Sequence, residues 1–275
     1  MATLSLEDGR LWYEETGEGR PLVFVHGGWM NGRSWEPQVE RFADEYRVVT
    51  LDVRGHGRTG ATDTDRYSID LFTDDLEALL EHLELEDPIL GGLSLGSMVV
   101  QEYLHRHPSR ASAAVLAGAI RSMPPVDLPQ GIKPLLSPTP ALTSSLAMTG
   151  PTATFQSLLW SIRSVTGEPW LSVDPSVRAT ALEAVGDVSR TEFRKVFEAL
   201  YRYEPSSLSA VETPTLVVHG DQEALPVRRQ GDDLADEVAG GRQRTLANAG
   251  HLVNQDRPAA FNETTASFLE RVGAT

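Results

Sequence analysis

Short apolar runs alternate with amphipathic helical patterns along most of this chain, and the alternation restricts the folds that it can adopt. Residues 22–25, Leu-Val-Phe-Val, form a continuous apolar run that is typical of a strand buried on both faces. Residues 47–51 repeat this pattern, and residues 34–45 between the two runs place apolar side chains at helical spacing. Alternation of this kind predicts a parallel sheet with helices on both of its faces.

The same alternation continues on both sides of a long interruption. Ser68 can cap a helix in which leucine and phenylalanine recur every three or four residues, and Pro108 is expected to end a helix that begins near residue 96. Further strands are expected at residues 11–15, 88–92, 113–119, 215–219 and 244–246, and further helices at residues 227–238 and 258–272. Together these elements predict a protein of the α/β class.

The interruption covers residues 121–209. It shows no clear strand pattern, opens with a proline-rich stretch and continues as helical segments that carry aromatic residues. We therefore expect residues 1–120 and 210–275 to form one α/β core, with residues 121–209 inserted as a helical cap.

Composition and charge argue against several classes of function. A formal net charge of −15 disfavours binding to nucleic acid or to a membrane surface, since both need basic patches. The absence of cysteine excludes disulfides and thiolate catalysis, and no histidine spacing suits a metal, so we expect no metal and no cofactor. Residues 1–10 lack the basic and apolar parts of a signal peptide, and no window is apolar enough to span a bilayer. These features favour a cytoplasmic protein.

A candidate nucleophile stands between a predicted strand and a predicted helix. Residues 92–96 are Gly-Leu-Ser-Leu-Gly and match the pattern G-x-S-x-G. In that context a nucleophilic serine occupies a sharp strand-to-helix turn, the nucleophile elbow. The two glycines allow the backbone to fold tightly around the serine. Ser94 is therefore the candidate nucleophile.

The residues that could activate Ser94 follow it in the chain. His251 stands in a loop directly after the last predicted strand, at the carboxyl edge where open α/β sheets place their ligands. The loop after residue 218 supplies two carboxylates, Asp221 and Glu223, between the serine and the histidine. Serine, acid and histidine in this order fit a catalytic triad, with either carboxylate as the acid.

One competing motif points to a nucleotide. Residues 55–60 are Gly-His-Gly-Arg-Thr-Gly and fit G-x-G-x-x-G after a predicted strand. A dinucleotide site needs a helix that opens at once, whereas an acidic polar loop follows at residues 61–65 and would repel a pyrophosphate. We interpret these glycines as a structural turn.

Five motifs in a fixed order make the chain resemble the α/β-hydrolase superfamily over nearly its whole length. They are His26-Gly27-Gly28 and residues 52–57, 92–96, 219–223 and 249–251. The resemblance implies a mostly parallel eight-stranded sheet with helices on both faces and a helical cap. In many such sequences the acid loop has the pattern G-x-x-D, and Glu223 occupies that position counted from Gly220. This register favours Glu223 over Asp221, which stays open as the alternative acid.

The resemblance also implies the roles of the site residues. Ser94 would attack an acyl carbon, His251 would take its proton, and the acid would hold the imidazole in the productive tautomer. The backbone N–H groups of Leu95 and Gly28 are expected to stabilise the oxyanion, with Trp29 as the alternative donor.

The substrate is the feature that the sequence constrains least. The predicted cap carries residues that could form an apolar pocket for a modest acyl or alcohol group, namely Met123, Met148, Phe155, Trp160 and Trp170. The elbow at residues 93–98 looks like that of relatives that open small esters and lactones, so we expect a carboxylesterase or lactonase that acts on a small molecule. Cofactor-free haloperoxidase or perhydrolase activity, carbon–carbon bond hydrolysis, and a ligand-binding receptor with weak turnover are the alternatives.

Overall fold

An eight-stranded sheet forms the centre of the computed structural model, which describes residues 2–125, 137–166 and 170–274. The strands are β1 (Ala2–Leu6), β2 (Gly9–Thr16), β3 (Arg20–Val25), β4 (Tyr46–Asp52), β5 (Ile89–Leu93), β6 (Ala113–Ala117), β7 (Thr215–Gly220) and β8 (Arg242–Leu246). Their order is β1-β2-β4-β3-β5-β6-β7-β8. β2 pairs antiparallel with β1 and β4, and the other pairs are parallel. The predicted mostly parallel sheet is confirmed.

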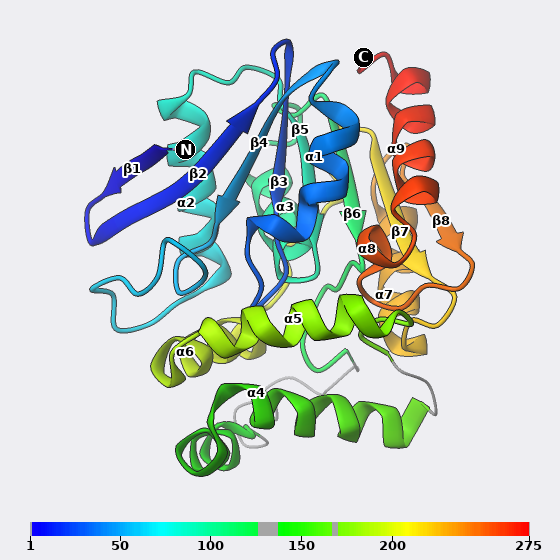
Figure 1. The fold of residues 1–275 in the computed structure, drawn as a ribbon. Coiled ribbons are helices and arrows are strands. Elements are labelled where there is room, and N and C mark those ends of the chain that lie inside the picture. Colours follow the sequence, from blue (N-terminus) through cyan, green and yellow to red (C-terminus); the bar gives the residue numbers. More distant parts are fainter. Residues whose placement is uncertain (1, 126–136, 167–169, 275) are drawn as a thin grey trace.

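Helices cover both faces of this sheet. The helices of the described residues are α1 (Glu36–Phe42), α2 (Ile69–His82), α3 (Leu95–Arg106), α4 (Thr139–Thr166), α5 (Pro175–Asp187), α6 (Arg190–Arg202), α7 (Leu225–Glu237), α8 (Val253–Asp256) and α9 (Pro258–Val272). Helices α1 and α9 lie on one face, and α2 and α3 lie on the other (Figure 1). This arrangement confirms the predicted α/β class.

Helix α2 illustrates how local sequence defines an element. The Ser68 hydroxyl accepts a hydrogen bond from the Leu71 backbone N–H at 3.1 Å and so caps the helix. Phe72, Leu76 and Leu79 then fall on its buried face. Burial of each such side chain contributes about 1.5–3 kcal/mol to stability. A cap at the start and apolar burial along the length therefore hold α2 in place.

Three short elements differ from the sequence prediction. The edge strand β1 was not predicted, because its mostly exposed side chains do not form an apolar run. Helix α8 has four residues, too few to show a helical period. The helix predicted at residues 34–45 begins instead as a 3₁₀ helix, η1 (Gly32–Trp35), and continues as α1 only to Phe42.

The chain between β6 and β7 carries helices α4, α5 and α6, and its described residues contain no strand. Figure 1 shows these helices together beyond the carboxyl ends of the parallel strands, with α5 between α4 and the sheet. Helix α4 is interrupted at Gly150, which has a non-helical φ of 80° and precedes Pro151. We refer to residues 121–209 as the insertion.

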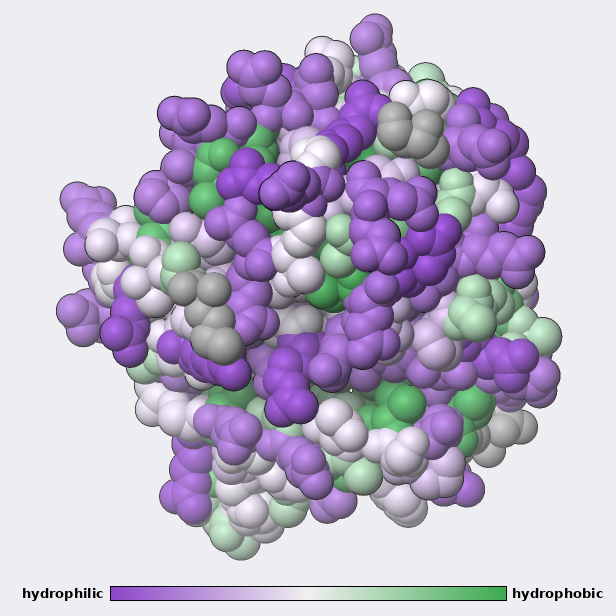
Figure 2. All heavy atoms as spheres, turned by 45° about the horizontal axis from the view of Figure 1, so that its top comes forward, coloured by the Kyte–Doolittle hydropathy of each residue, from purple (hydrophilic) through white to green (hydrophobic). Residues whose placement is uncertain are grey.

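Polar and charged side chains dominate the face of the molecule that Figure 2 shows. In Figure 2, hydrophilic residues cover most of the visible face, and apolar residues appear as small separate patches. This distribution agrees with the net charge of −15. Within the described ranges, no helix is both long enough and apolar enough to cross a membrane.

Candidate active site

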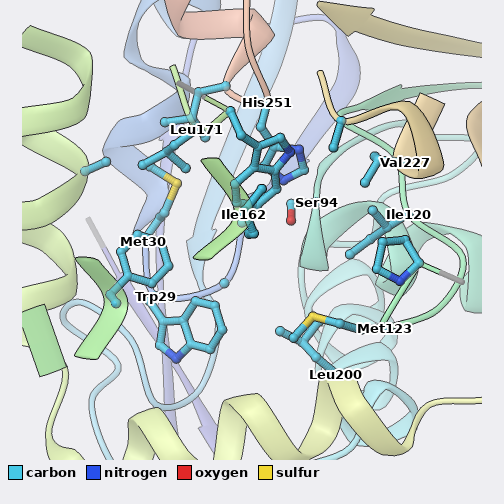
Figure 3. Close-up of a pocket in the computed structure, with 18 of the residues that line it drawn as sticks. Trp29, Met30, Ser94, Ile120, Met123, Ile162, Leu171, Leu200, Val227 and His251 are labelled. Carbon is cyan, nitrogen blue, oxygen red and sulfur yellow. The ribbon is translucent and has the colours of Figure 1, made fainter. Parts of the chain in front are cut away.

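Ser94 lies at the turn between β5 and α3. Its backbone adopts φ 53° and ψ −112°, a strained conformation for a residue with a side chain. A hydrogen bond of 3.0 Å from the Ser94 N–H to the Ala117 carbonyl ties the turn to the end of β6. The Ser94 side chain faces a cavity that lies between the core and the insertion (Figure 3). This is the geometry that the pattern G-x-S-x-G predicts for a nucleophile elbow.

Close backbone approaches explain both glycines of the elbow. A Cβ at Gly92 would lie 2.4 Å from the carbonyl oxygen of Gly96. A Cβ at Gly96 would lie 2.1 Å from the carbonyl oxygen of Val25. Neither position has room for a side chain, so the two glycines let α3 pack directly against β3 and β5.

His251 and Glu223 form a buried pair. His251 lines the same cavity as Ser94 (Figure 3). Nδ1 of His251 lies 2.6 Å from Oε2 of Glu223. The other carboxylate oxygen, Oε1, accepts hydrogen bonds from the Ala224 N–H at 2.8 Å and from the indole Nε1 of Trp170. Because the carboxylate engages Nδ1, the opposite ring nitrogen, Nε2, is the one left to exchange a proton with Ser94.

The Glu223 carboxyl group is held in its ionised form. Burial raises its pKa, but the charge of His251 and its hydrogen bond act in the opposite direction, and the pKa lies below its ordinary value. The hydrogen bond from the Ala224 N–H also lowers it. A negative charge next to the imidazole stabilises the imidazolium that proton transfer from a serine would create.

Asp221, the alternative acid, binds the backbone of the loop that carries His251. Its Oδ1 accepts a hydrogen bond from the Ala249 N–H at 3.2 Å. Burial raises the pKa of Asp221, but backbone hydrogen bonds from Asn248 and Ala249 outweigh this effect and lower the pKa overall. The structure therefore brings Glu223 to His251, whereas Asp221 shapes the loop that carries the histidine.

Two of the three candidate oxyanion donors lie next to each other. A Cβ at Gly28 would be 3.8 Å from the Cβ of Leu95, so the two residues are neighbours. Leu95 is the first residue of α3, where backbone N–H groups have no acceptor within the helix. The Trp29 N–H instead donates to Nε2 of His56 at 2.8 Å. Because this N–H is already engaged, the prediction of Trp29 as the alternative oxyanion donor is wrong.

Two buried histidines support the loop that follows β3. Nε2 of His56 accepts the hydrogen bond from Trp29, and Nε2 of His26 accepts one from the Val53 N–H at 2.9 Å. Burial lowers the pKa of His26 to about 4. Burial, and then the proximity of His26, lowers the pKa of His56 to about 3. Both rings are therefore neutral at pH 7 and act as acceptors. The position of His56 between two glycines was the only signal for this role in the sequence.

A cavity of about 290 Å³ opens over Ser94 and His251. Three of the predicted pocket residues, Met123, Phe155 and Trp170, line it. The cavity has further apolar wall residues that the sequence did not indicate, and these include Met30, Ile120, Ile162, Leu171, Leu200 and Val227 (Figure 3). They come from distant parts of the chain, so no local pattern could have grouped them.

Met148 and Trp160 do not belong to this cavity. Their exposed fractions are 82% and 71%, so the prediction that they line the pocket is wrong. Trp160 follows the cavity residue Phe155 by five positions on α4, which turns it about 140° around the helix. Met148 precedes the break at Gly150, and the helical register of Phe155 does not extend to it.

The described lining of the cavity is apolar apart from Ser94, Ser122 and His251. It includes no lysine, arginine, aspartate or glutamate. A charged group that entered would lose its hydration without gaining a partner of opposite charge from these walls. No group of three or more histidine, aspartate or glutamate residues in the described part of the chain could hold a metal ion.

The glycine-rich motif at residues 55–60 forms a turn and does not open a helix, since α2 begins only at Ile69. The Asp52 carboxylate accepts hydrogen bonds from the N–H groups of Gly32 and Arg58, both at 2.7 Å. The bond from Arg58 closes the turn, and the bond from Gly32 ties the turn to the segment after β3. The motif is thus a structural turn, as the sequence led us to expect.

The fold and the site together define a hydrolase of a known family. A family model described as the alpha/beta hydrolase family matches residues 22–264. The chain therefore belongs to the alpha/beta hydrolase family, and the resemblance noted in the sequence is confirmed.

Relatives in this family have names that indicate different reactions. The chain is 30% identical to a non-heme chloroperoxidase of Kitasatospora aureofaciens, over 98% of this chain and 100% of that protein. It is 25% identical to 3-oxoadipate enol-lactonase 2 of Acinetobacter baylyi, over 98% of this chain and 96% of that protein. The structure of an esterase from Thermogutta terrifontis matches with a TM-score of 0.81 and 20% identity, over 99% of both chains, and shows the same fold. The fold alone does not select one of these reactions.

Proposed function

We propose that the protein is a serine hydrolase that cleaves small, uncharged carboxylic esters or lactones through an acyl-enzyme on Ser94. The observation that carries this proposal is the buried Glu223–His251 pair, whose histidine lines one apolar cavity together with Ser94. The relative named as an enol-lactonase supports ester chemistry on this scaffold. In this proposal the insertion acts as the cap that encloses the substrate.

Acylation begins at the Ser94 hydroxyl. His251 takes the hydroxyl proton through Nε2 while the oxygen attacks the acyl carbon, and Glu223 stabilises the imidazolium that forms. The N–H groups of Leu95 and Gly28 donate to the developing oxyanion. His251 then gives its proton to the leaving alcohol, or to the ring oxygen of a lactone, and the acyl group stays on Ser94.

Water completes the cycle. His251 removes a proton from a water molecule, which attacks the acyl carbon of the Ser94 ester. The second tetrahedral intermediate collapses, the carboxylic acid leaves, and His251 returns the proton to the Ser94 oxygen. The same two backbone donors serve both halves of the reaction.

The cavity favours a substrate of modest size without a charge. Its volume of about 290 Å³ is at the small end of ligand pockets, which span about 300–1,000 Å³. A substrate carboxylate would lose its hydration against the described walls, which supply no cation. Short acyl groups with an apolar alcohol or ring fit these walls best.

Perhydrolysis on the same serine is a second candidate, because the 30% identical relative is named a non-heme chloroperoxidase. In this reaction hydrogen peroxide attacks the acyl-enzyme in place of water. A peracid then leaves instead of the acid, and His251 handles the proton in the same way. Ser94, His251 and Glu223 would serve both reactions, so the competing nucleophile alone distinguishes them.

Hydrolysis of p-nitrophenyl esters from acetate to decanoate tests the proposal. We expect the wild-type protein to prefer short chains, because the cavity is small, and Ser94→Ala to lose about 10⁴–10⁶-fold in kcat. Ser157→Ala, on the exposed side of α4, is the control substitution. The p-nitrophenyl hemisuccinate should show a kcat/KM at least about 10-fold below that of the butyrate, because its carboxylate must be desolvated.

Several results would contradict this proposal. Ser94→Ala as active as the wild type would exclude the acyl-enzyme, and a well-folded wild-type protein without ester turnover would exclude the esterase assignment. Hemisuccinate cleaved as fast as butyrate would refute the preference for uncharged substrates. Peroxide-dependent bromination of an indicator that outpaces ester hydrolysis would favour the perhydrolysis candidate instead.

A further inference from the structure

Trp170, a residue of the insertion, contacts both members of the buried acid–histidine pair. Its indole Nε1 donates a hydrogen bond to Oε1 of Glu223. Its ring stacks on the imidazole of His251, with the ring centroids 4.5 Å apart and 29° between the ring planes. Its backbone carbonyl accepts a hydrogen bond from the His251 N–H at 2.8 Å. Three separate contacts thus link one residue of the insertion to the pair.

Neighbouring contacts hold this part of the insertion against the His251 loop. The Leu252 N–H donates to the Leu171 carbonyl at 2.9 Å, next to the bond between His251 and Trp170. A Cβ at Gly250 would lie 2.6 Å from the Trp170 carbonyl oxygen, so the glycine permits this close approach. Trp170 is therefore placed by its backbone as well as by its ring.

The indole N–H completes the hydrogen bonding of the buried carboxylate. Oε2 of Glu223 faces His251, and Oε1 has the Ala224 N–H and the Trp170 indole as donors. A glutamate has one more rotatable bond than an aspartate, so its carboxylate needs more contacts to keep one orientation. Hydrogen bonds to an ionised group are also stronger than those between neutral groups.

We propose that Trp170 is a positioning residue, through which the insertion holds Glu223 and His251 in the orientation that activates Ser94. This inference rests on the proposed function, since it gives Trp170 a role in that reaction. Trp170 also lines the cavity. The experiment must therefore separate positioning of the pair from a simple role as a wall of the cavity.

Trp170→Phe is the decisive variant, because it keeps an aromatic ring beside His251 and removes the indole N–H. Phe155→Leu is the matched control, since Phe155 lines the same cavity from the insertion and packs on Trp29. With a short p-nitrophenyl ester, Trp170→Phe should lower kcat about 10-fold and leave KM within about 2-fold. Phe155→Leu should change mainly KM.

The pH profile of kcat/KM is a second measurement that a wall residue would not affect. Loss of the indole donor removes a hydrogen bond that stabilises the ionised Glu223 carboxylate, which raises the apparent pKa of the coupled acid–histidine pair. The acid limb of the profile should therefore move to higher pH in Trp170→Phe and stay in place in Phe155→Leu. His219 of β7 interacts electrostatically with Glu223, His251 and Arg228 of α7. Asp256 of α8 accepts a hydrogen bond from the Gly250 N–H, next to His251. Both variants retain these titratable groups.

A double variant shows whether Trp170 acts through Glu223. If it does, adding Trp170→Phe to Glu223→Gln should change kcat by less than about 2-fold, because the carboxylate to be positioned is already gone. Additive losses in the double variant would overturn the positioning role. A Trp170→Phe variant that changes only KM and leaves the acid limb of the pH profile in place would also overturn the positioning role.

Failure of the proposed function gives a different result. If the wild-type protein hydrolyses no ester, the rate at which a fluorophosphonate labels Ser94 replaces kcat, because this reagent requires only an activated serine. Slower labelling of Trp170→Phe than of the wild type would support the positioning role even without ester turnover. Equal rates for the two proteins, including no labelling of either, would overturn it.

Discussion

Two carboxylates in the loop after β7 have different surroundings, although only one residue separates them. Asp221 accepts a hydrogen bond from the backbone of Ala249. Glu223 lies two residues further along the chain, and its Oε2 contacts Nδ1 of His251. The position along the loop therefore decides which carboxylate meets the imidazole.

Amide variants of the two acids should behave differently. Glu223→Gln should lower kcat about 10²–10⁴-fold, because a neutral amide no longer stabilises the imidazolium and can favour the wrong tautomer. Asp221→Asn should lose little activity, since its amide oxygen can still accept the Ala249 N–H. Steady-state kinetics on a short p-nitrophenyl ester measure both. A larger loss in Asp221→Asn than in Glu223→Gln would reverse the assignment.

Among the elements of the insertion, α6 is joined to the core by a buried polar cluster. Nζ of Lys195 lies 3.1 Å from Oε1 of Glu192 and donates to the Thr64 carbonyl at 2.7 Å. The Tyr67 hydroxyl donates to Oε2 of Glu192. Burial, reinforced by this hydrogen bond, raises the pKa of Tyr67, so the phenol keeps its proton. The cluster thus ties α6 to the loop between β4 and α2.

Glu192→Leu should destabilise the protein strongly. The substitution leaves the buried Lys195 ammonium without its carboxylate partner, and breaking a buried pair in this way costs about 3–5 kcal/mol. Urea unfolding followed by circular dichroism gives the free energy of unfolding. Glu183→Ala, at an exposed position on α5, serves as the control and should change it by less than about 0.5 kcal/mol. Equal midpoints for the two variants would show that the cluster does not anchor α6.

For the whole molecule, buried neutral histidines link stability to pH. Burial lowers the pKa of His26 and His219 to about 4 and that of His56 to about 3. In the unfolded chain these rings take up protons below about pH 6.5, whereas in the folded protein they stay neutral until the pH is far lower. The stability that these rings contribute to the folded protein is therefore fully present above about pH 6.5 and is lost as the pH falls below it.

The free energy of unfolding should thus decrease from pH 7.5 to pH 5. Each buried histidine adds up to about 1.4 kcal/mol per pH unit to this slope. His219→Leu removes one titrating ring, so its slope should be shallower than that of the wild type. Burial raises the pKa of Asp52, which gives the pH dependence of stability a slope of the opposite sign. Both proteins contain Asp52, so its effect cancels when their slopes are compared. Identical slopes would contradict a neutral buried His219.

The order of strands and helices followed from the sequence because neighbouring residues encode it. An apolar run such as residues 22–25 and the capped pattern after Ser68 depend on local periodicity and local hydrogen bonds. The sequence also predicted that Ser94, the acid loop and His251 lie together. Each follows a predicted strand of a parallel sheet, and the carboxyl ends of such strands meet at one edge. The edge strand β1 lacked such a signal.

Contacts between distant segments were decided only by the tertiary structure. Trp170 and Glu223 are separated by 53 positions in the chain, and no local pattern relates them. The same holds for the Trp29 N–H, which donates to His56, and for Met148 and Trp160, which lie on the surface instead of in the cavity. Periodicity tells which residues share a face of an element. Only the packing of that face against the rest of the chain determines which partners its groups meet.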